Sequence, residues 1–353
     1  MSTSSPKEIP LGAVRFNSDS QKLEYWMGSA WMQIQTFSPN LGNDNASAGQ
    51  SAKGTGVRGL FIGGDPGRDT NMDYFTIPTR GNAIDFGNYP ISNGTGVRGI
   101  IGSNTRGFGA GGESPSAGDS HNVIGKWEFS STGSAIDFAD LTFTMKGGAG
   151  CSNATRGIVT RGYGAPSISR EEIDFFTMAS QQNAVDFGDL QSGASYLGCG
   201  TASPIRGVII TGRDTSGQAN IIEFVTISTT GNATDFGDTP KVDNAVASCA
   251  GGNSTRGVIA GGGDSAITDV TFITYTTLGN AVKFGDLHTG NSYQASASDR
   301  ITLVTGGGTT PANPTNRMDA IAIATGGTSI DFGDMTVSKN NMSGSSNGHG
   351  GLG

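Results

Sequence analysis

Charged residues, cysteine and histidine are all scarce in this chain of 353 residues. Charged residues make up 15% of it, against about 25% in a typical soluble domain. Cys151, Cys199 and Cys249 lie about fifty residues apart, without a Cys-x-x-Cys pair or a neighbouring histidine. Metal sites need such clusters. We therefore expect small buried strand residues at these positions, no metal site and no cofactor.

Long apolar runs and basic clusters are also absent. No apolar stretch approaches the 18 or so residues of a membrane-spanning helix, so we expect no membrane insertion. The formal net charge is −8, which disfavours contact with phosphate backbones, so we expect no nucleic-acid partner. Residues 1–10 lack the basic-then-apolar layout of a signal peptide, so export by that route is not expected.

Glycine, in contrast, is abundant, with 58 residues, and it belongs to a repeat. A Gly-Asn-Ala turn followed by Asp-Phe-Gly-Asp recurs six times with small variations. The intervals between its phenylalanines are 52, 49, 49, 48 and 48 residues. These phenylalanines are Phe86, Phe138, Phe187, Phe236, Phe284 and Phe332.

A second motif, Asn-x-Thr-Arg-Gly followed by apolar residues and Gly-Gly, recurs at the same interval. The glycine pairs include Gly63-Gly64, Gly111-Gly112, Gly261-Gly262 and Gly306-Gly307. The arginines either hold the repeats together through ion pairs or backbone contacts, which we favour, or ring one face and bind an anion. They are Arg58, Arg106, Arg156, Arg206, Arg256 and Arg300.

Each repeat is interpreted as four short strands. A small first strand precedes the arginine, an apolar second strand follows it, and the fourth strand carries the phenylalanine. The Gly-Asn residues before the fourth strand favour a hairpin, and no segment has a sustained helical period. Four strands per repeat of about fifty residues predict one blade of an all-β propeller, in a single domain spanning residues 1–353.

The two ends of the chain decide the predicted number of blades. Residues 338–350 have the character of another first strand, with His349 in the place of the arginine. Residues 11–36 supply three further strands, with a turn at Gly28-Ser29. We predict seven blades, the last closed by pairing 338–350 with 11–36, which would remove exposed sheet edges. The alternative is six blades and a separate N-terminal anchor.

The glycine pair and the aromatic residue of the fourth strand resemble the kelch repeat over about residues 11–350. Kelch blades usually carry tryptophan where this chain has phenylalanine, and a tyrosine on the third strand, which Tyr74 keeps in part. This likeness implies a kelch-like propeller and leaves the function open.

The stretch from Gly12 to Asn17, leading to Leu23–Trp26 and Trp31, resembles a short motif of bacteriophage virion proteins, particularly in tailed phages of marine bacteria. The resemblance implies a structural protein of the tail, fibre or baseplate, made in the host cytoplasm and carried in the virion. Its implied partners are other virion proteins, together with a receptor or glycan on the host surface.

Catalytic motifs find little support. Asp-Phe-Gly recurs in several repeats without the lysine strand and His-Arg-Asp loop of a kinase, so we expect no enzymatic activity, and binding residues are not identified. A glycosidase built from two carboxylates of different blades is the catalytic alternative. A soluble propeller that binds carbohydrate or protein is the other, with Trp127, Tyr163 and Tyr293 as the available aromatic platforms.

The variable loops between second and third strands are the expected binding elements, because loops specialise on a rigid framework. They are Asp65 to Asn71, Glu113 to Asn122, Tyr163 to Glu172, Arg213 to Asn220, Asp264 to Thr268 and Thr309 to Asn316.

Overall fold

The computed structural model describes residues 9–17, 22–33, 57–91, 98–113, 120–164, 168–193, 195–214, 216–311 and 313–353. These residues form strands and three short 3-10 helices, with no α-helix among them: η2 (Ile77–Thr79), η3 (Val242–Asn244) and η4 (Gly350–Leu352). Within the same ranges, no helix has the length and apolar character needed to cross a bilayer. The prediction of an all-β chain is confirmed.

The chain divides into two compact units, residues 1–51 and 52–353, rather than the single domain predicted. In the first unit, an antiparallel sheet has the order β1-β2-β3. Its strands are β1 (Val14–Asn17), β2 (Lys22–Trp26) and β3 (Trp31–Gln33).

The second unit contains six sheets built on one plan, which we number 1 to 6 along the chain. In sheet 1 the C-terminal strand pairs with β4, in the order β30-β4-β5-β6. Residues 98–102 occupy the first-strand position of sheet 2, through a bridge between Gly102 and Gly107. The strands of these two sheets are β30 (Ser343–Ser346), β4 (Arg58–Ile62), β5 (Asn71–Thr76) and β6 (Ile84–Asn88), then β7 (Arg98–Gly99), β8 (Arg106–Ala110), β9 (His121–Glu128) and β10 (Ile136–Met145).

Sheets 3 and 4 follow the same order, and β7 also runs parallel to the first strand of sheet 3. Sheet 3 consists of β11 (Ala149–Ser152), β12 (Arg156–Gly164), β13 (Ile168–Thr177) and β14 (Val185–Asp189). Sheet 4 consists of β15 (Cys199–Ala202), β16 (Arg206–Ile210), β19 (Ile221–Thr226) and β20 (Thr234–Asp238), with a small ribbon of β17 (Arg213–Asp214) and β18 (Gly217–Gln218) in its loop.

Sheets 5 and 6 complete the series. The short strand β28 (Gly327–Thr328), in the connection between the third and fourth strands of sheet 6, joins sheet 5 by running parallel to its fourth strand. Sheet 5 consists of β21 (Cys249–Gly252), β22 (Arg256–Ala260), β23 (Asp269–Thr274) and β24 (Val282–Asp286). Sheet 6 consists of β25 (Ala295–Ser298), β26 (Thr302–Gly306), β27 (Arg317–Ala322) and β29 (Ile330–Asp334).

The predicted pairing of residues 338–350 with residues 11–36 is wrong. Ser343–Ser346 pairs with Gly59–Ile62, whereas the described strands of residues 14–33 pair with one another. The physical reason is the shape of the first strands, whose small side chains let neighbouring backbones approach closely. At Gly344 a Cβ atom would overlap the backbone of Ser296 in sheet 6, and β4, which begins with the repeat arginine Arg58, supplies the neighbouring strand.

The hydrophobic core lies between neighbouring sheets. Each of the six buried clusters joins two consecutive sheets, and one joins sheet 6 to sheet 1. In that cluster Phe75 of β5 packs on Phe332 of β29, with ring centroids 5.4 Å apart. Burial of apolar side chains therefore holds each sheet against two neighbours.

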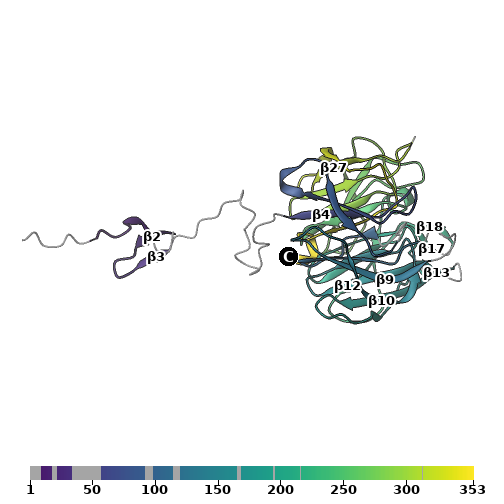
Figure 1. Ribbon diagram of the computed structural model, residues 1–353, viewed down its shortest axis with the longest axis horizontal. Helices are drawn as coiled ribbons and strands as arrows, with labels where there is room; N and C mark the ends of the chain where they lie inside the picture. The colour runs from purple at the N-terminus through teal and green to yellow at the C-terminus, as the bar shows by residue number, and fades with distance from the viewer. Residues whose placement is uncertain are drawn as a thin grey trace, which may run out of the picture. The chain divides into compact units, whose positions relative to one another are not determined.

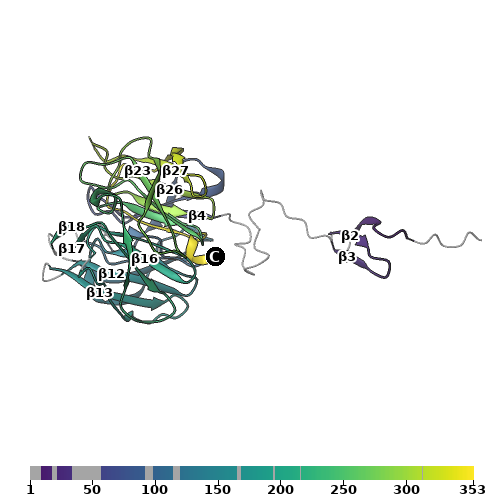
Figure 2. The same cartoon turned by 180° about the vertical axis from the view of Figure 1, so that it is seen from behind.

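The sheets have two distinct ends. The arginine end carries Arg58, Arg106, Arg156, Arg206 and Arg256 and the turns between first and second strands. The loop end carries the connections between second and third strands. Both views of the second unit place β17 and β18 on one side and the C-terminus on the opposite side (Figures 1 and 2).

Candidate functional site

The five arginines of the arginine end connect neighbouring sheets. The Nη1 of Arg206 donates to the carbonyl of Tyr275 at 2.5 Å, and Tyr275 directly follows the third strand of sheet 5. The same bond recurs at five sheet boundaries, because each arginine begins a second strand at the same register. The acceptors for Arg58, Arg106, Arg156 and Arg256 are the carbonyls of Phe129, Met178, Ile227 and Ile323, at 2.6 to 3.1 Å.

An aromatic ring of the third strand supports most of these guanidinium groups. The Cζ of Arg206 lies 4.7 Å from the ring centroid of Phe224, and that of Arg256 lies 4.4 Å from Phe272. In sheet 2, Arg106 instead has an ion pair with Glu128 at 3.3 Å. Each arginine is thus held between a ring or carboxylate of its own sheet and a carbonyl of the next sheet.

Arg300 does not belong to this series. Pairing of Gly252 with Gly257 and of Ser298 with Leu303 aligns Arg256 with Thr302, so Arg300 lies two residues too early. Its Nη2 donates to the carbonyl of Gly353. The predicted glycine pair of sheet 6, Gly306-Gly307, is likewise displaced by one residue. Gly306 belongs to β26, and the two glycines with positive φ are Gly307 and Gly308.

The six phenylalanines lie on fourth strands and point into the cores between sheets. Five are buried, and Phe284 is partly buried. The pairs Phe187–Phe175 and Phe236–Phe224 meet edge to face, with ring centroids 5.9 and 6.1 Å apart. The Asp-Phe-Gly repeat therefore supplies core packing in these sheets.

The glycine after the phenylalanine allows the next sheet to approach. Gly237 has φ +143°, and a Cβ there would lie 2.6 Å from the carbonyl carbon of Gly279, in the Gly-Asn turn of sheet 5. That turn donates from Gly279 N to the Phe236 carbonyl at 2.8 Å, and Asn280 Oδ1 accepts from Asp238 N at 3.0 Å. The same hydrogen bonds run from sheet 1 to sheet 6, where Gly81 N donates to the Phe332 carbonyl at 2.9 Å.

Acidic residues of third strands form a second set of contacts between sheets. The carboxylate of Asp174 accepts from Thr142 N and Oγ1 of sheet 2 at 2.7 to 2.9 Å. Glu223 and Asp73 receive the corresponding bonds in sheets 4 and 1. Desolvation raises the pKa of Asp174 above its ordinary value, although the hydrogen bonds from Thr142 lower it in part.

Asp269 occupies a related place between sheets 4 and 5. Its Oδ2 lies 2.8 Å from Lys241 Nζ, and its Oδ1 lies 2.7 Å from Lys283 Nζ. Burial alone would raise its pKa, but the hydrogen bonds from the two lysines outweigh burial and lower the pKa to about 2. These carboxylates are engaged in holding sheets together.

The loop end differs from one sheet to the next. The predicted loop Tyr163 to Glu172 is largely an extension of β12 and β13, paired as far as Gly164 and Ile168. Ion pairs here include Lys146–Glu113 at 2.8 Å, Arg213–Asp264 at 2.8 Å and Lys339–Asp69 at 3.0 Å. Of these, Arg213–Asp264 joins the loops of sheets 4 and 5.

A pair of tyrosines gives this end its best candidate for ligand contact. The rings of Tyr163 and Tyr196 lie 5.2 Å apart, and Lys146 Nζ lies 5.3 Å from the Tyr163 centroid. Both tyrosines are partly exposed. Of the other predicted platforms, Trp127 is buried in a core and Tyr293 is partly exposed beside β25. The repeat pattern gives no signal for Tyr196, because this residue lies between a fourth and a first strand.

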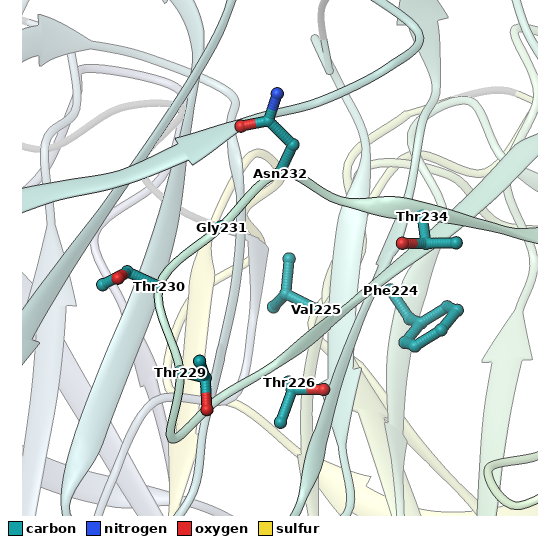
Figure 3. Close-up of a pocket in the computed structure, with 8 residues that line it drawn as sticks. All are labelled: Phe224, Val225, Thr226, Thr229, Thr230, Gly231, Asn232 and Thr234. Carbon is teal, nitrogen blue, oxygen red and sulfur yellow. The ribbon is translucent and has the colours of Figure 1, made fainter.

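A shallow depression of about 300 Å³ lies beside the turn between β19 and β20 (Figure 3). Its lining includes Phe224 and the hydroxyl groups of Thr226, Thr229, Thr230 and Thr234, and none of its eight residues is charged. Threonine hydroxyls can donate and accept hydrogen bonds, but they offer no acid or base for catalysis near neutral pH.

The C-terminal residues lie at the arginine end, a position that the repeat pattern does not indicate. The imidazole of His349 is buried, with Nε2 2.9 Å from the Gly102 carbonyl and Nδ1 accepting from Gly351 N. Desolvation lowers its pKa to about 4. A Cβ at Gly350 would lie 2.5 Å from the Ala202 carbonyl, so this segment packs on the first strands of several sheets. Arg58 N also donates to Asn347 Oδ1, which places Val57 at this end.

The three cysteines are buried, as small residues of first strands. Burial raises the pKa of the Cys151 thiol to about 12. Within the described ranges, no group of three histidine, cysteine, aspartate or glutamate side chains is close enough to hold a metal ion.

Comparison with known proteins places this chain in no group. No protein-family model matches it, and no curated protein matches its sequence.

Proposed function

We propose that the six sheets are the blades of a kelch-like, six-bladed β-propeller, closed by the C-terminal strand. Three features support this arrangement: the six cores between consecutive sheets, the hydrogen bonds from sheet 6 back to sheet 1, and the pairing of β30 with β4. Closure of this kind leaves no blade without two neighbours. The N-terminal sheet is then the separate element of the six-blade alternative.

We further propose that the protein is a non-enzymatic structural component of a bacteriophage virion, in the tail, fibre or baseplate region. The observation that carries this proposal is the difference between the two ends of the sheets. The turns, the arginines and Val57, the first described residue of the second unit, share the arginine end. Loops of different length and chemistry occupy the loop end, which is free to face a virion partner or a host surface. The phage-like stretch of residues 12–31 adds to this support.

A soluble carbohydrate- or protein-binding propeller is the second candidate. The specific observation in its favour is the Tyr163–Tyr196 pair with Lys146 beside it. Aromatic faces flanked by polar groups suit sugar rings and peptide side chains alike.

Mass spectrometry of purified particles from the source tests the first candidate. We expect the protein in the particles, at a low fixed ratio to the major capsid protein that matches a tail symmetry. Absence from the particles would refute the virion proposal and leave the binding propeller. Glycan arrays probed with the wild-type protein and with Tyr163→Ala would then test the second candidate, with Tyr293→Ala as the matched control.

A further inference from the structure

The N-terminal sheet has two faces of very different character. Alternation along its strands, with Val14 opposite Tyr25, Phe16 opposite Leu23 and Tyr25 opposite Met32, places these five side chains on one side. We call Val14, Phe16, Leu23, Tyr25 and Met32 the apolar face. Arg15, Asn17, Glu24, Trp26 and Trp31 alternate to the other side.

The other side is internally partnered. Arg15 forms an ion pair with Glu24 at 2.9 Å, and its guanidinium lies 4.2 Å from the ring centroid of Trp31. Trp26 and Trp31 pack with centroids 5.4 Å apart, and Asn17 Nδ2 donates to Glu24 Oε1 at 3.0 Å. On this side, Arg15 and Glu24 therefore neutralise each other, and the two tryptophans pack on each other.

The apolar face, in contrast, is open. Phe16 is 64% exposed and Val14 60%, and Leu23, Tyr25 and Met32 are 37–44% exposed. Single exposed apolar residues are normal on proteins, but five contiguous ones mark an interaction surface. A small sheet also gains stability when its hydrophobic face is buried.

Area and charge favour a second copy of the same face as the occupant. Aromatic side chains bury about 150–250 Å² each, so five large residues at these exposures present on the order of 500 Å². Two such faces together bury about 1,000 Å², the lower bound for a specific interface.

Electrostatics point the same way. None of the five residues is charged. Residues 1–51 contain three Lys or Arg and four Asp or Glu, a net charge of −1, and the remaining −7 of the total −8 belongs to the second unit. Self-association through the N-terminal sheet therefore brings near-neutral surfaces together, and repulsion between the acidic units opposes it less.

We propose that the apolar face is a homotypic association surface, which pairs with the same face of a second copy of this chain. Because both copies present the same uncharged, apolar residues, an isologous arrangement places one face against the other. This inference does not depend on the virion proposal, since it concerns the free protein in solution.

Sedimentation velocity of the full-length protein over a range of concentrations tests the proposal. We expect reversible, concentration-dependent association of the wild type, and at least a tenfold weaker association for Phe16→Asp. Ile205→Asp, at a site 66% exposed in the second unit, serves as the matched control and should associate like the wild type. A wild type that stays monomeric, or a Phe16→Asp variant that associates normally, would overturn the proposal.

A cross-linking variant covers the case in which the charge unfolds the sheet. Met32→Cys keeps an apolar side chain on the face, and the three native cysteines are buried. A short bis-maleimide should join Met32→Cys copies into dimers and leave Ile205→Cys monomeric. Equal cross-linking of both variants, or of neither, counts against association through this face, including the case in which the face packs within its own chain.

Discussion

The contacts that recur from one sheet boundary to the next differ in chemistry from the contacts at the loop end. The recurring bonds run to backbone atoms: an arginine to a carbonyl, and a Gly-Asn-Ala turn to the fourth strand of its neighbour. At the loop end, the bonds join one charged side chain to another, and the pair changes from sheet to sheet. A bond to a backbone atom at a fixed register needs the same side chain in every repeat, whereas one pair of charged side chains can be replaced by another pair. The repeated motifs of the sequence are therefore the residues that connect neighbouring sheets.

This comparison predicts that small substitutions between sheets cost more than drastic ones at the loop end. The largest effect is expected for Gly237→Ala. Its Cβ would lie 2.6 Å from the carbonyl carbon of Gly279, a fixed backbone atom, so we expect a loss of about 3 kcal/mol or more from strain and overlap combined.

Gly279→Ala is the matched control, because its φ is +144° and no atom lies within 4 Å of the added Cβ. We expect about 1–2 kcal/mol there, from backbone strain alone. Denaturant unfolding of both variants measures the difference. Equal losses would show that the close approach of neighbouring sheets does not limit stability.

The second prediction concerns pH and the C-terminal segment. Burial lowers the pKa of His349 from 6.5 to about 4, so the unfolded chain takes up a proton before the folded one. The free energy of unfolding therefore keeps its full value above pH 6.5 and falls between pH 6.5 and 4, by at most about 3 kcal/mol. The decisive quantity is the slope of unfolding free energy against pH in this window.

His349→Asn should flatten that slope, and other titrating groups cancel when it is compared with the wild type. Protonation of Asp269, whose pKa is about 2, costs stability only as the pH falls from 3.8 toward 2, outside the window of His349. Identical slopes for the two proteins would mean that His349 is hydrated in the folded state.

The repeat, its four strands and its all-β character could be predicted from the sequence, because glycine turns and core phenylalanines recur in one register. The partner of the C-terminal strand could not. Small residues occur both at 46–52 and at Ser343–Ser346, and composition does not say which of them pairs with β4. The short first strands gain their place from close backbone contacts across several sheets, which a local pattern does not contain.

Arg300 and Tyr196 show two further limits. Arg300 matches the repeat by residue type, but Leu303 and Val304 show that the strand begins two residues later. Tyr196 has no repeat partner, and only the fold places its ring beside Tyr163. Residues at a fixed position of a strand recur in every repeat and can be predicted from the sequence. Residues that the folded loops bring together do not recur, so the sequence does not predict them.

The smallest expected effects concern Arg206 of sheet 4 and Arg213 in the loop of that sheet. Arg206→Ala removes a charged hydrogen bond to the Tyr275 carbonyl and the packing on Phe224, and should cost about 2 kcal/mol. Arg213→Ala removes a half-exposed ion pair with Asp264 and should cost less than about 1 kcal/mol.

Thermal and denaturant unfolding of the two variants, at low and high salt, makes the comparison quantitative. Salt should erase the loss in Arg213→Ala, since its ion pair is exposed, and should leave most of the loss in Arg206→Ala. If Arg206→Ala melts like the wild type but loses binding to an anionic ligand, the arginines serve recognition instead, and the arginine end becomes the binding surface. A larger loss in Arg213→Ala than in Arg206→Ala would reverse the ranking of the two regions.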